Sequence, residues 1–298
     1  MSSTTTLRVS LVSAALSLFS LPTASLAYDM RIVASFSILG DMVEEVVGDL
    51  AEVTTIVGPD ADAHVYQPSV ADARAVAEAD VIFVNGLGFE TWSDTLIAEA
   101  GTEAEAHVAT DGITPVLVEG ETDPHAWNSL INGMIYVQNI ADAMSEAAPE
   151  HADTFAANAA SYIAELEALD ADTRASLAEL PADKRTVVTA HDAFGYLADA
   201  YDMTFLAPVG IDTEGEPSAR DLATLIAQLK ETGVAALFVE NITSPALVQQ
   251  ISDETGIDIG GRLFSDALSE RGGPATSYLA MFQHNLRALL NALGDTSS

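Results

Sequence analysis

Four side chains in this 298-residue sequence have the chemistry of a binding site for a divalent transition metal. His64, His125 and His191 each lie in a loop-like stretch, and Asp266 follows a run of apolar residues. Neutral imidazole nitrogens and a carboxylate oxygen are donors that a borderline cation such as Zn²⁺ accepts. A fourth protein donor leaves little room for a substrate water, so these residue types favour capture of a metal over catalysis.

Position alone leaves a simpler interpretation open for each of the four. Loops at the carboxyl ends of parallel strands hold the ligands of open α/β sheets, but solvated histidines also occur there. Asp266 could instead cap the following turn, and with 45 acidic residues in the chain this is the better interpretation of the bare sequence. The other three histidines, His107, His151 and His284, are most simply surface or packing residues.

Apolar β-branched runs alternate with amphipathic patterns along the chain. The apolar runs predict strands at residues 31–36, 52–57, 81–85, 186–189, 236–239 and 262–265. The amphipathic patterns predict helices at residues 38–47, 69–79, 91–100, 131–147, 193–200, 219–231, 245–254 and about 275–293. Strands separated by helices of about 10–15 residues are typical of βαβ units, so we expect an α/β fold with parallel sheets.

The stretch from Pro149 to Leu180 contains no glycine and no strand pattern. About 28 helical residues at 1.5 Å each would span roughly 42 Å, longer than a compact lobe usually needs. We therefore expect an N-terminal α/β lobe at 28–148, a linking backbone helix at 149–180 and a C-terminal α/β lobe at 181–298. A single large α/β domain with one long surface helix is the alternative. In the two-lobe arrangement each lobe supplies two of the four candidate ligands.

The first 27 residues have the order of a secretory signal peptide. Arg8 precedes the apolar run 11–19, and Ser25-Leu26-Ala27 resembles a cleavage site. We expect residues 1–27 to be removed and the remainder to function in the periplasm. The sequence has no cysteine, so we expect no lipid anchor. A net charge of −34 would repel nucleic acid and anionic lipid, so neither is an expected partner.

Six stretches resemble, in order, the motifs of the zinc/manganese solute-binding proteins of ABC importers. They lie at residues 33–41, 62–69 (Asp-Ala-His-Val-Tyr-Gln-Pro-Ser), 123–127 (Asp-Pro-His-Ala-Trp), 189–196, 210–218 and 263–268 (Leu-Phe-Ser-Asp-Ala-Leu). The resemblance implies two α/β lobes bridged by a backbone helix, with the metal between them. It places the four ligand positions of the family on His64, His125, His191 and Asp266.

The resemblance also implies the cargo and the partners. Members similar to manganese receptors usually carry Glu at the third ligand position, where this chain has His191, so Zn²⁺ is expected and Mn²⁺ is the alternative. Many zinc members carry a histidine-rich loop before the second ligand, but residues 112–122 are short and contain no histidine. The implied partners are the membrane permease of an ABC importer and a periplasmic metallochaperone, and we expect a monomer.

Two other functions compete with this interpretation. A zinc-dependent hydrolase would need an open metal position and a nearby base, yet the sequence has neither H-E-x-x-H nor G-x-S-x-G. A receptor for a metal chelate would favour an aromatic or arginine-lined cleft over converging histidines. We therefore expect a binding protein and not an enzyme.

Overall fold

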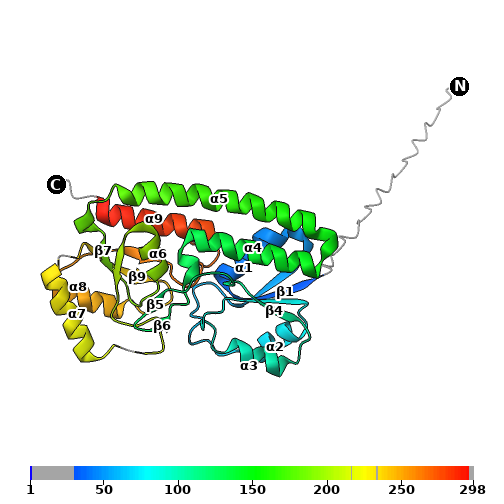
Figure 1. Ribbon diagram of the computed structural model, residues 1–298, viewed down its shortest axis with the longest axis horizontal. Helices are drawn as coiled ribbons and strands as arrows, with labels where there is room; N and C mark the ends of the chain where they lie inside the picture. The colour runs from blue at the N-terminus through cyan, green and yellow to red at the C-terminus, as the bar shows by residue number, and fades with distance from the viewer. Residues whose placement is uncertain (2–29, 216, 233, 295–298) are drawn as a thin grey trace.

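The computed structural model describes Met1 and residues 30–215, 217–232 and 234–294. The predicted signal peptide at 1–27 thus lies, apart from Met1, outside the described residues. Two four-stranded parallel sheets lie side by side, and long helices run along one side of both (Figure 1). No helix among the described residues is long and apolar enough to cross a membrane. The predicted α/β fold with two parallel sheets and a long helix is confirmed.

The N-terminal lobe is built on a sheet with strand order β2-β1-β3-β4. The strands are β1 (Arg31–Phe36), β2 (Glu52–Val57), β3 (Val81–Val84) and β4 (Glu105–Val108), and every pair is parallel. Five of the six β1 residues are buried, as expected for a central strand covered on both faces. The helices of this lobe are α1 (Ser37–Val47), α2 (Val70–Ala77) and α3 (Ser93–Ala100), with a 3₁₀ turn at Gly48–Leu50.

The C-terminal lobe repeats this plan with strand order β10-β9-β7-β8. Its strands are β7 (Thr186–Val188), β8 (Thr204–Leu206), β9 (Ala236–Glu240) and β10 (Ile259–Leu263), again all parallel. Its helices are α6 (Gly195–Tyr201), α7 (Ala219–Thr232) and α8 (Ala246–Thr255), with a 3₁₀ turn at Ala182–Lys184. Strands of both sheets therefore end near the centre of the molecule, where ligand loops can meet (Figure 1).

Three helices connect the two lobes. α4 (Leu130–Ala147) leads through a 3₁₀ turn (Pro149–His151) into α5 (Ala152–Ala178), and α9 (Tyr278–Gly294) packs against α5 and α1. One apolar core runs without a break from β1 through these helices to the C-terminal sheet. A second, smaller core lies between that sheet and helices α7 and α8. The lobe boundaries at 148/149 and 180/181 stay a prediction.

Several predicted boundaries need correction. The strand expected at 262–265 is β10, at Ile259–Leu263. Its two glycines hid the apolar pattern, and Gly260 is required because a Cβ there would lie 2.5 Å from the Ala292 side chain. The helix expected from residue 193 begins at Gly195. The short strand β8 and the hairpin of β5 (Leu117–Val118) and β6 (Glu121–Thr122) were not predicted, since two or three residues give no readable period.

Candidate metal centre

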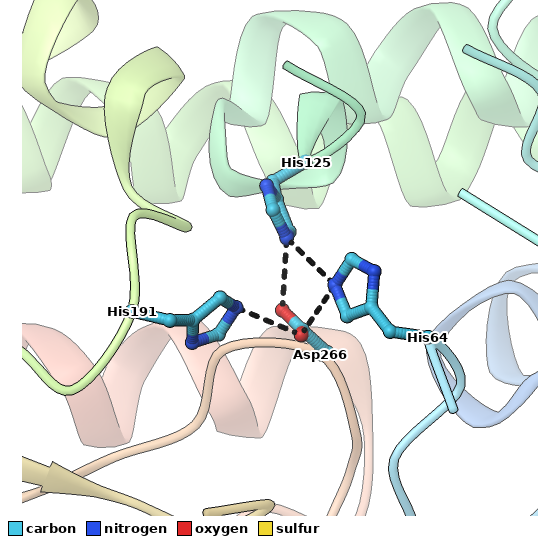
Figure 2. A group of neighbouring side chains, drawn as sticks. All are labelled: His64, His125, His191 and Asp266. Atoms are coloured by element: carbon cyan, nitrogen blue, oxygen red, sulfur yellow. Dashed lines mark hydrogen bonds and ion pairs between the residues drawn. The ribbon is translucent and has the colours of Figure 1, made fainter. Parts of the chain in front are cut away.

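The four predicted residues meet at one point between the lobes (Figure 2). One donor atom from each of His64, His125, His191 and Asp266 lies within 4.8 Å of the others. The Nε2 atoms of His64 and His191 lie 3.3 and 3.1 Å from Asp266 Oδ2, and His125 Nε2 lies 3.7 Å from Oδ1. The side chains are at most 5 % exposed, so any bound cation would be largely removed from water.

Each ligand loop is placed by a nearby element. His64 follows β2, and Asp266 lies three residues beyond the end of β10. His191 follows β7 and forms an isolated parallel β-bridge with Val209. His125 follows the β5–β6 hairpin and precedes a 3₁₀ turn (Ala126–Asn128). α6 begins four residues after His191, so His191 itself lies in the loop between β7 and this helix.

Asp266 does not cap the following turn. Its side chain is fully buried, and neither carboxylate oxygen has a hydrogen-bond partner of good geometry among the described residues. Burial alone would raise the pKa of this carboxyl, but the His191 and His125 imidazoles hold it well below its usual range. A buried carboxylate ringed by three imidazoles is costly unless a cation neutralises it.

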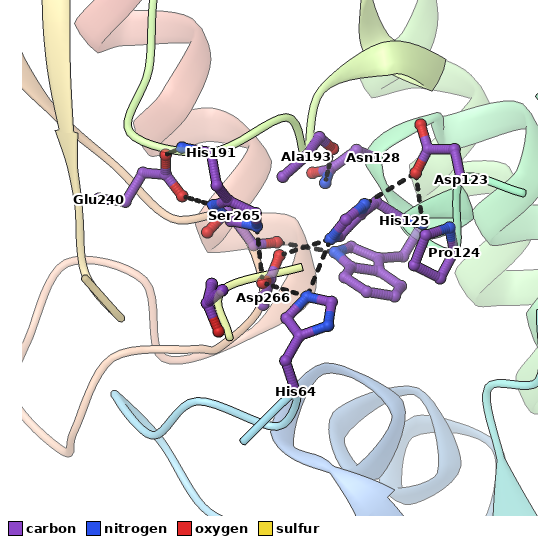
Figure 3. A network of polar contacts seen from close by, with 12 residues as sticks. His64, Asp123, Pro124, His125, Asn128, His191, Ala193, Glu240, Ser265 and Asp266 are labelled. Atoms are coloured by element: carbon purple, nitrogen blue, oxygen red, sulfur yellow. Dashed lines mark hydrogen bonds and ion pairs between the residues drawn. The ribbon is translucent and has the colours of Figure 1, made fainter. Parts of the chain in front are cut away.

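Two further carboxylates hold the outer nitrogens of the imidazole rings (Figure 3). Asp123 Oδ1 lies 2.7 Å from His125 Nδ1, and Glu240 Oε2 lies 2.6 Å from His191 Nδ1. A carboxylate at Nδ1 keeps the proton there and leaves Nε2 free to bind a metal. Burial alone would lower the pKa of His191, but the charges of Glu240 and Asp266 raise it well above its usual value.

Asp123 and Glu240 were not among the site residues predicted from the sequence. Asp123 had a local signal, because an aspartate two residues before a histidine can accept its backbone N–H, as Asp123 and Asp62 both do. Glu240 had none. It lies 49 residues from His191 and is brought there by the pairing of β7 with β9.

Both tryptophans do more than pack. Trp92 Nε1 donates to the carbonyl of Ala63, and Trp127 Nε1 donates to the carbonyl of Ser265, at 2.8 and 2.7 Å. Each carbonyl belongs to the residue just before a candidate ligand. The Trp127 ring also packs against the Phe36 ring, with 4.8 Å between the ring centroids. The indole N–H groups additionally fix the backbone of the ligand loops.

A turn of three residues with positive φ places the aromatic ring of Phe89 beside the centre. Gly86, Leu87 and Gly88 all have positive φ, at 83°, 56° and 83°, and the Phe89 ring that follows lies 4.8 Å from the His64 ring. The Glu90 carboxylate accepts the Gly86 N–H, at 3.3 Å, and helps hold this turn. Burial raises the pKa of Glu90. Phe89 therefore packs against His64 and also lies near the His125 ring, at 6.1 Å between the centroids.

The other three histidines are not part of the centre. His107 lies in β4 and contacts the Phe83 ring, His151 contacts Phe155, and His284 Nε2 lies 3.1 Å from the Arg262 carbonyl. The four-residue cluster is the single group of this kind among the described residues. These assignments agree with the predicted packing or surface roles.

A groove of about 570 Å³ lies beside His191, which is the one candidate ligand among its lining residues. Asp62, Thr213 and Thr243 line it together with apolar side chains of α7 and α8. The Thr213 hydroxyl donates to Asp62 at 2.6 Å across the boundary between the lobes. The fold and the site together define a two-lobed α/β protein with a buried, nitrogen-rich candidate metal centre.

Comparison with known proteins agrees with this class. Residues 32–292 match the family model described as zinc-uptake complex component A, periplasmic. The chain belongs to this family of metal-binding proteins of ABC importers.

The relatives differ in the metal that their names state. The chain is 34 % identical over 275 residues to the iron-binding protein YfeA of Yersinia pestis, covering 90 % of this chain and 88 % of YfeA. It is 32 % identical over 265 residues to the manganese-binding lipoprotein MntA of Halalkalibacterium halodurans, with coverage of 89 % and 88 %. The periplasmic zinc-binding protein TroA of Treponema pallidum is similar in structure, with a TM-score of 0.85, 28 % identity and coverage of 89 % and 99 %.

Proposed function

We propose that this protein captures Zn²⁺ in the periplasm as cargo and delivers it to the membrane permease of an ABC importer. The observation that carries the proposal is the convergence of His64, His125, His191 and Asp266 within 4.8 Å. Three imidazoles and one carboxylate form a complete tetrahedral set for zinc. Within the described part of the chain, both carboxylate oxygens of Asp266 lack a hydrogen-bond partner of good geometry, which suits a role as ligand.

The same geometry favours binding over turnover. A catalytic zinc site keeps a position for water or substrate, whereas four protein donors fill a tetrahedral shell. Asp123 and Glu240 are occupied with the imidazole Nδ1 atoms and backbone N–H groups. These two carboxylates hold the imidazole rings in place, a role different from that of the general base that a zinc-dependent hydrolase needs.

Manganese is the second candidate cargo, because relatives such as MntA are named as manganese-binding. The ligand set favours zinc, since Mn²⁺ gains less from imidazole nitrogen and more from oxygen donors. The relation to TroA, named as zinc-binding, supports the same choice.

The remaining expectations extend this proposal. We propose a monomer with lobes at residues 28–148 and 181–298 joined by residues 149–180, and a periplasmic metallochaperone as one source of the ion. Several relatives are named lipoproteins, so the lack of a lipid anchor stays a prediction.

The test is metal binding by the purified chain. We expect about one zinc ion per chain, lost in single His64→Ala, His191→Ala and Asp266→Ala variants but retained in His107→Ala, which removes a histidine outside the centre. Retention of zinc by a variant lacking all four ligands would refute the site. Competition on the metal-free protein decides the cargo, and displacement of zinc by an equimolar amount of manganese would favour the manganese receptor.

A further inference from the structure

Asp60, in the turn that precedes His64, connects the two lobes. Its carboxylate accepts the Asn241 side-chain N–H at 3.0 Å on Oδ1 and the Glu270 backbone N–H at 3.2 Å on Oδ2. Its own backbone N–H donates to the Leu268 carbonyl at 2.8 Å. Asp60 belongs to the N-terminal lobe and thus makes three hydrogen bonds to two segments of the C-terminal lobe.

One of those two segments carries Asp266, and the other carries Glu240. Leu268 and Glu270 follow Asp266 by two and four residues. Asn241 follows Glu240, the residue that contacts His191 Nδ1. The Asn241 amide also donates to the Ala267 carbonyl at 3.1 Å, so the two segments are joined to each other as well as to Asp60.

The backbone at Asp60 is adapted to this role. Its φ of 52° lies in the left-handed region, where aspartate is tolerated better than most side chains. The residue is exposed and makes no contribution to the apolar core. It can therefore be replaced without opening a cavity.

The loop that carries His64 is held at a second point by Asp62. Asp62 Oδ1 accepts the His64 backbone N–H, and Oδ2 accepts the Thr213 hydroxyl of the C-terminal lobe. Although His64 follows a strand of the N-terminal sheet, its loop is bound on both sides of Ala61 to the opposite lobe.

From this geometry we infer that Asp60 is a positioning residue of the metal centre. It joins the His64 loop to the segments that carry Asp266 and Glu240. Because these hydrogen bonds keep the ligand loops of the two lobes attached to each other, His64 cannot move away from Asp266 alone, and the bound ion is released slowly. The inference rests on the proposed function. In this role Asp60 does not contact the metal but lengthens the time for which the ion stays bound.

The test compares zinc release from the full chain and three variants, measured by stopped-flow transfer to an excess of chromogenic chelator. Asp60→Gly removes the carboxylate and suits the positive φ. Asp60→Asn keeps one acceptor oxygen but turns an amide N–H₂ toward one of the donors. The matched control is Asp202→Gly, because Asp202 has φ of 55°, is exposed and pairs with Arg185 away from the centre.

We expect zinc to dissociate about tenfold faster from Asp60→Gly, at an intermediate rate from Asp60→Asn, and within twofold of the parent rate from Asp202→Gly. Association rates should stay within twofold. The visible spectrum of bound Co²⁺ should change in Asp60→Gly alone, because it reports the coordination geometry.

Four results would overturn the inference. Release from Asp60→Gly within twofold of the parent refutes it and leaves the proposed function intact. Equal acceleration in Asp202→Gly, or an unchanged Co²⁺ spectrum with a lowered melting temperature of the metal-free protein, assigns the effect to general stability. Failure of the parent chain to bind zinc refutes the proposed function, and the inference with it.

Discussion

Glu240 and Asp123 both contact the Nδ1 atom of a candidate ligand, yet the structure predicts that their amide variants differ in effect. In Asp123 one oxygen, Oδ1, accepts both the His125 backbone N–H and the contact from Nδ1, while Oδ2 has no hydrogen-bond partner in the described part of the chain. In Glu240 the two carboxylate oxygens make different contacts. Oε1 accepts the backbone N–H groups of Ala190 and His191, and Oε2 lies against His191 Nδ1.

Asp123→Asn can keep its carbonyl oxygen at the Oδ1 position and preserve both contacts of that atom. The variant loses the charge and buries an N–H₂ group where Oδ2 had no partner. We expect zinc affinity to fall about tenfold, or about 1.4 kcal/mol.

In Glu240→Gln, neither orientation of the amide preserves the contacts of both carboxylate oxygens. With its carbonyl toward the backbone N–H groups, the amide N–H₂ faces Nδ1 and moves the imidazole proton to Nε2, which can then no longer bind metal. The opposite orientation sets N–H₂ against two backbone donors. We expect the zinc dissociation constant to rise about 100-fold, or about 2.7 kcal/mol.

The assay is zinc competition against a chelator of known affinity, with urea unfolding of the metal-free proteins as a control for stability. We expect Glu240→Gln to bind zinc about tenfold more weakly than Asp123→Asn. Equal losses in the two variants, or a Glu240→Gln protein within twofold of the parent, would show that the division of contacts between the carboxylate oxygens has no role.

Three further predictions concern stability. Burial raises the pKa of Asp41 from 3.8 to about 7, so the folded state holds a proton that the unfolded chain releases, and stability should fall as pH rises from about 4 to 7. Asp41→Asn, which can still accept the Tyr278 backbone N–H, should therefore gain more in melting temperature at pH 8 than at pH 5. Gly133→Ala would place a Cβ 2.5 Å from the Tyr278 hydroxyl oxygen and should cost about 1–3 kcal/mol in urea unfolding. Zinc at 100 times its dissociation constant should stabilise the parent by about 2.7 kcal/mol, and a chelator should reverse this in calorimetry.

The sequence predicted most of the scaffold because the scaffold follows local patterns. β1 and β2 have the predicted bounds, since each is a six-residue β-branched or apolar run between helix and turn signals. The long helix was predicted from the absence of breakers between Pro149 and Pro181. β10 was misplaced because Gly260 is chosen for close packing against α9, which is a tertiary requirement.

The candidate site was only partly predictable, for a related reason. Histidines in loops after strands can be found from the pattern, but for Asp266 the bare sequence favoured a capping role, and only the family resemblance favoured a ligand. The Trp127–Ser265 hydrogen bond joins residues 138 positions apart. Contacts of this kind depend on how the two sheets are placed, which no local pattern encodes.

The continuous core restricts how the loaded protein can open. A hinge between the lobes would have to separate apolar side chains that α4, α5 and α9 share with both sheets. Exposing even 400 Å² of apolar surface would cost about 10 kcal/mol, comparable to the whole stability of a typical domain. Release of the ion should therefore proceed by movement of the ligand loops.

We accordingly expect hydrogen exchange to change on zinc removal in residues 58–68, 190–194, 209–215 and 264–270, with α4 and α5 protected equally in both states. The small-angle scattering profile should stay nearly the same. A large change in that profile would mean that the lobes separate as rigid bodies, at a cost that the shared core makes difficult to meet.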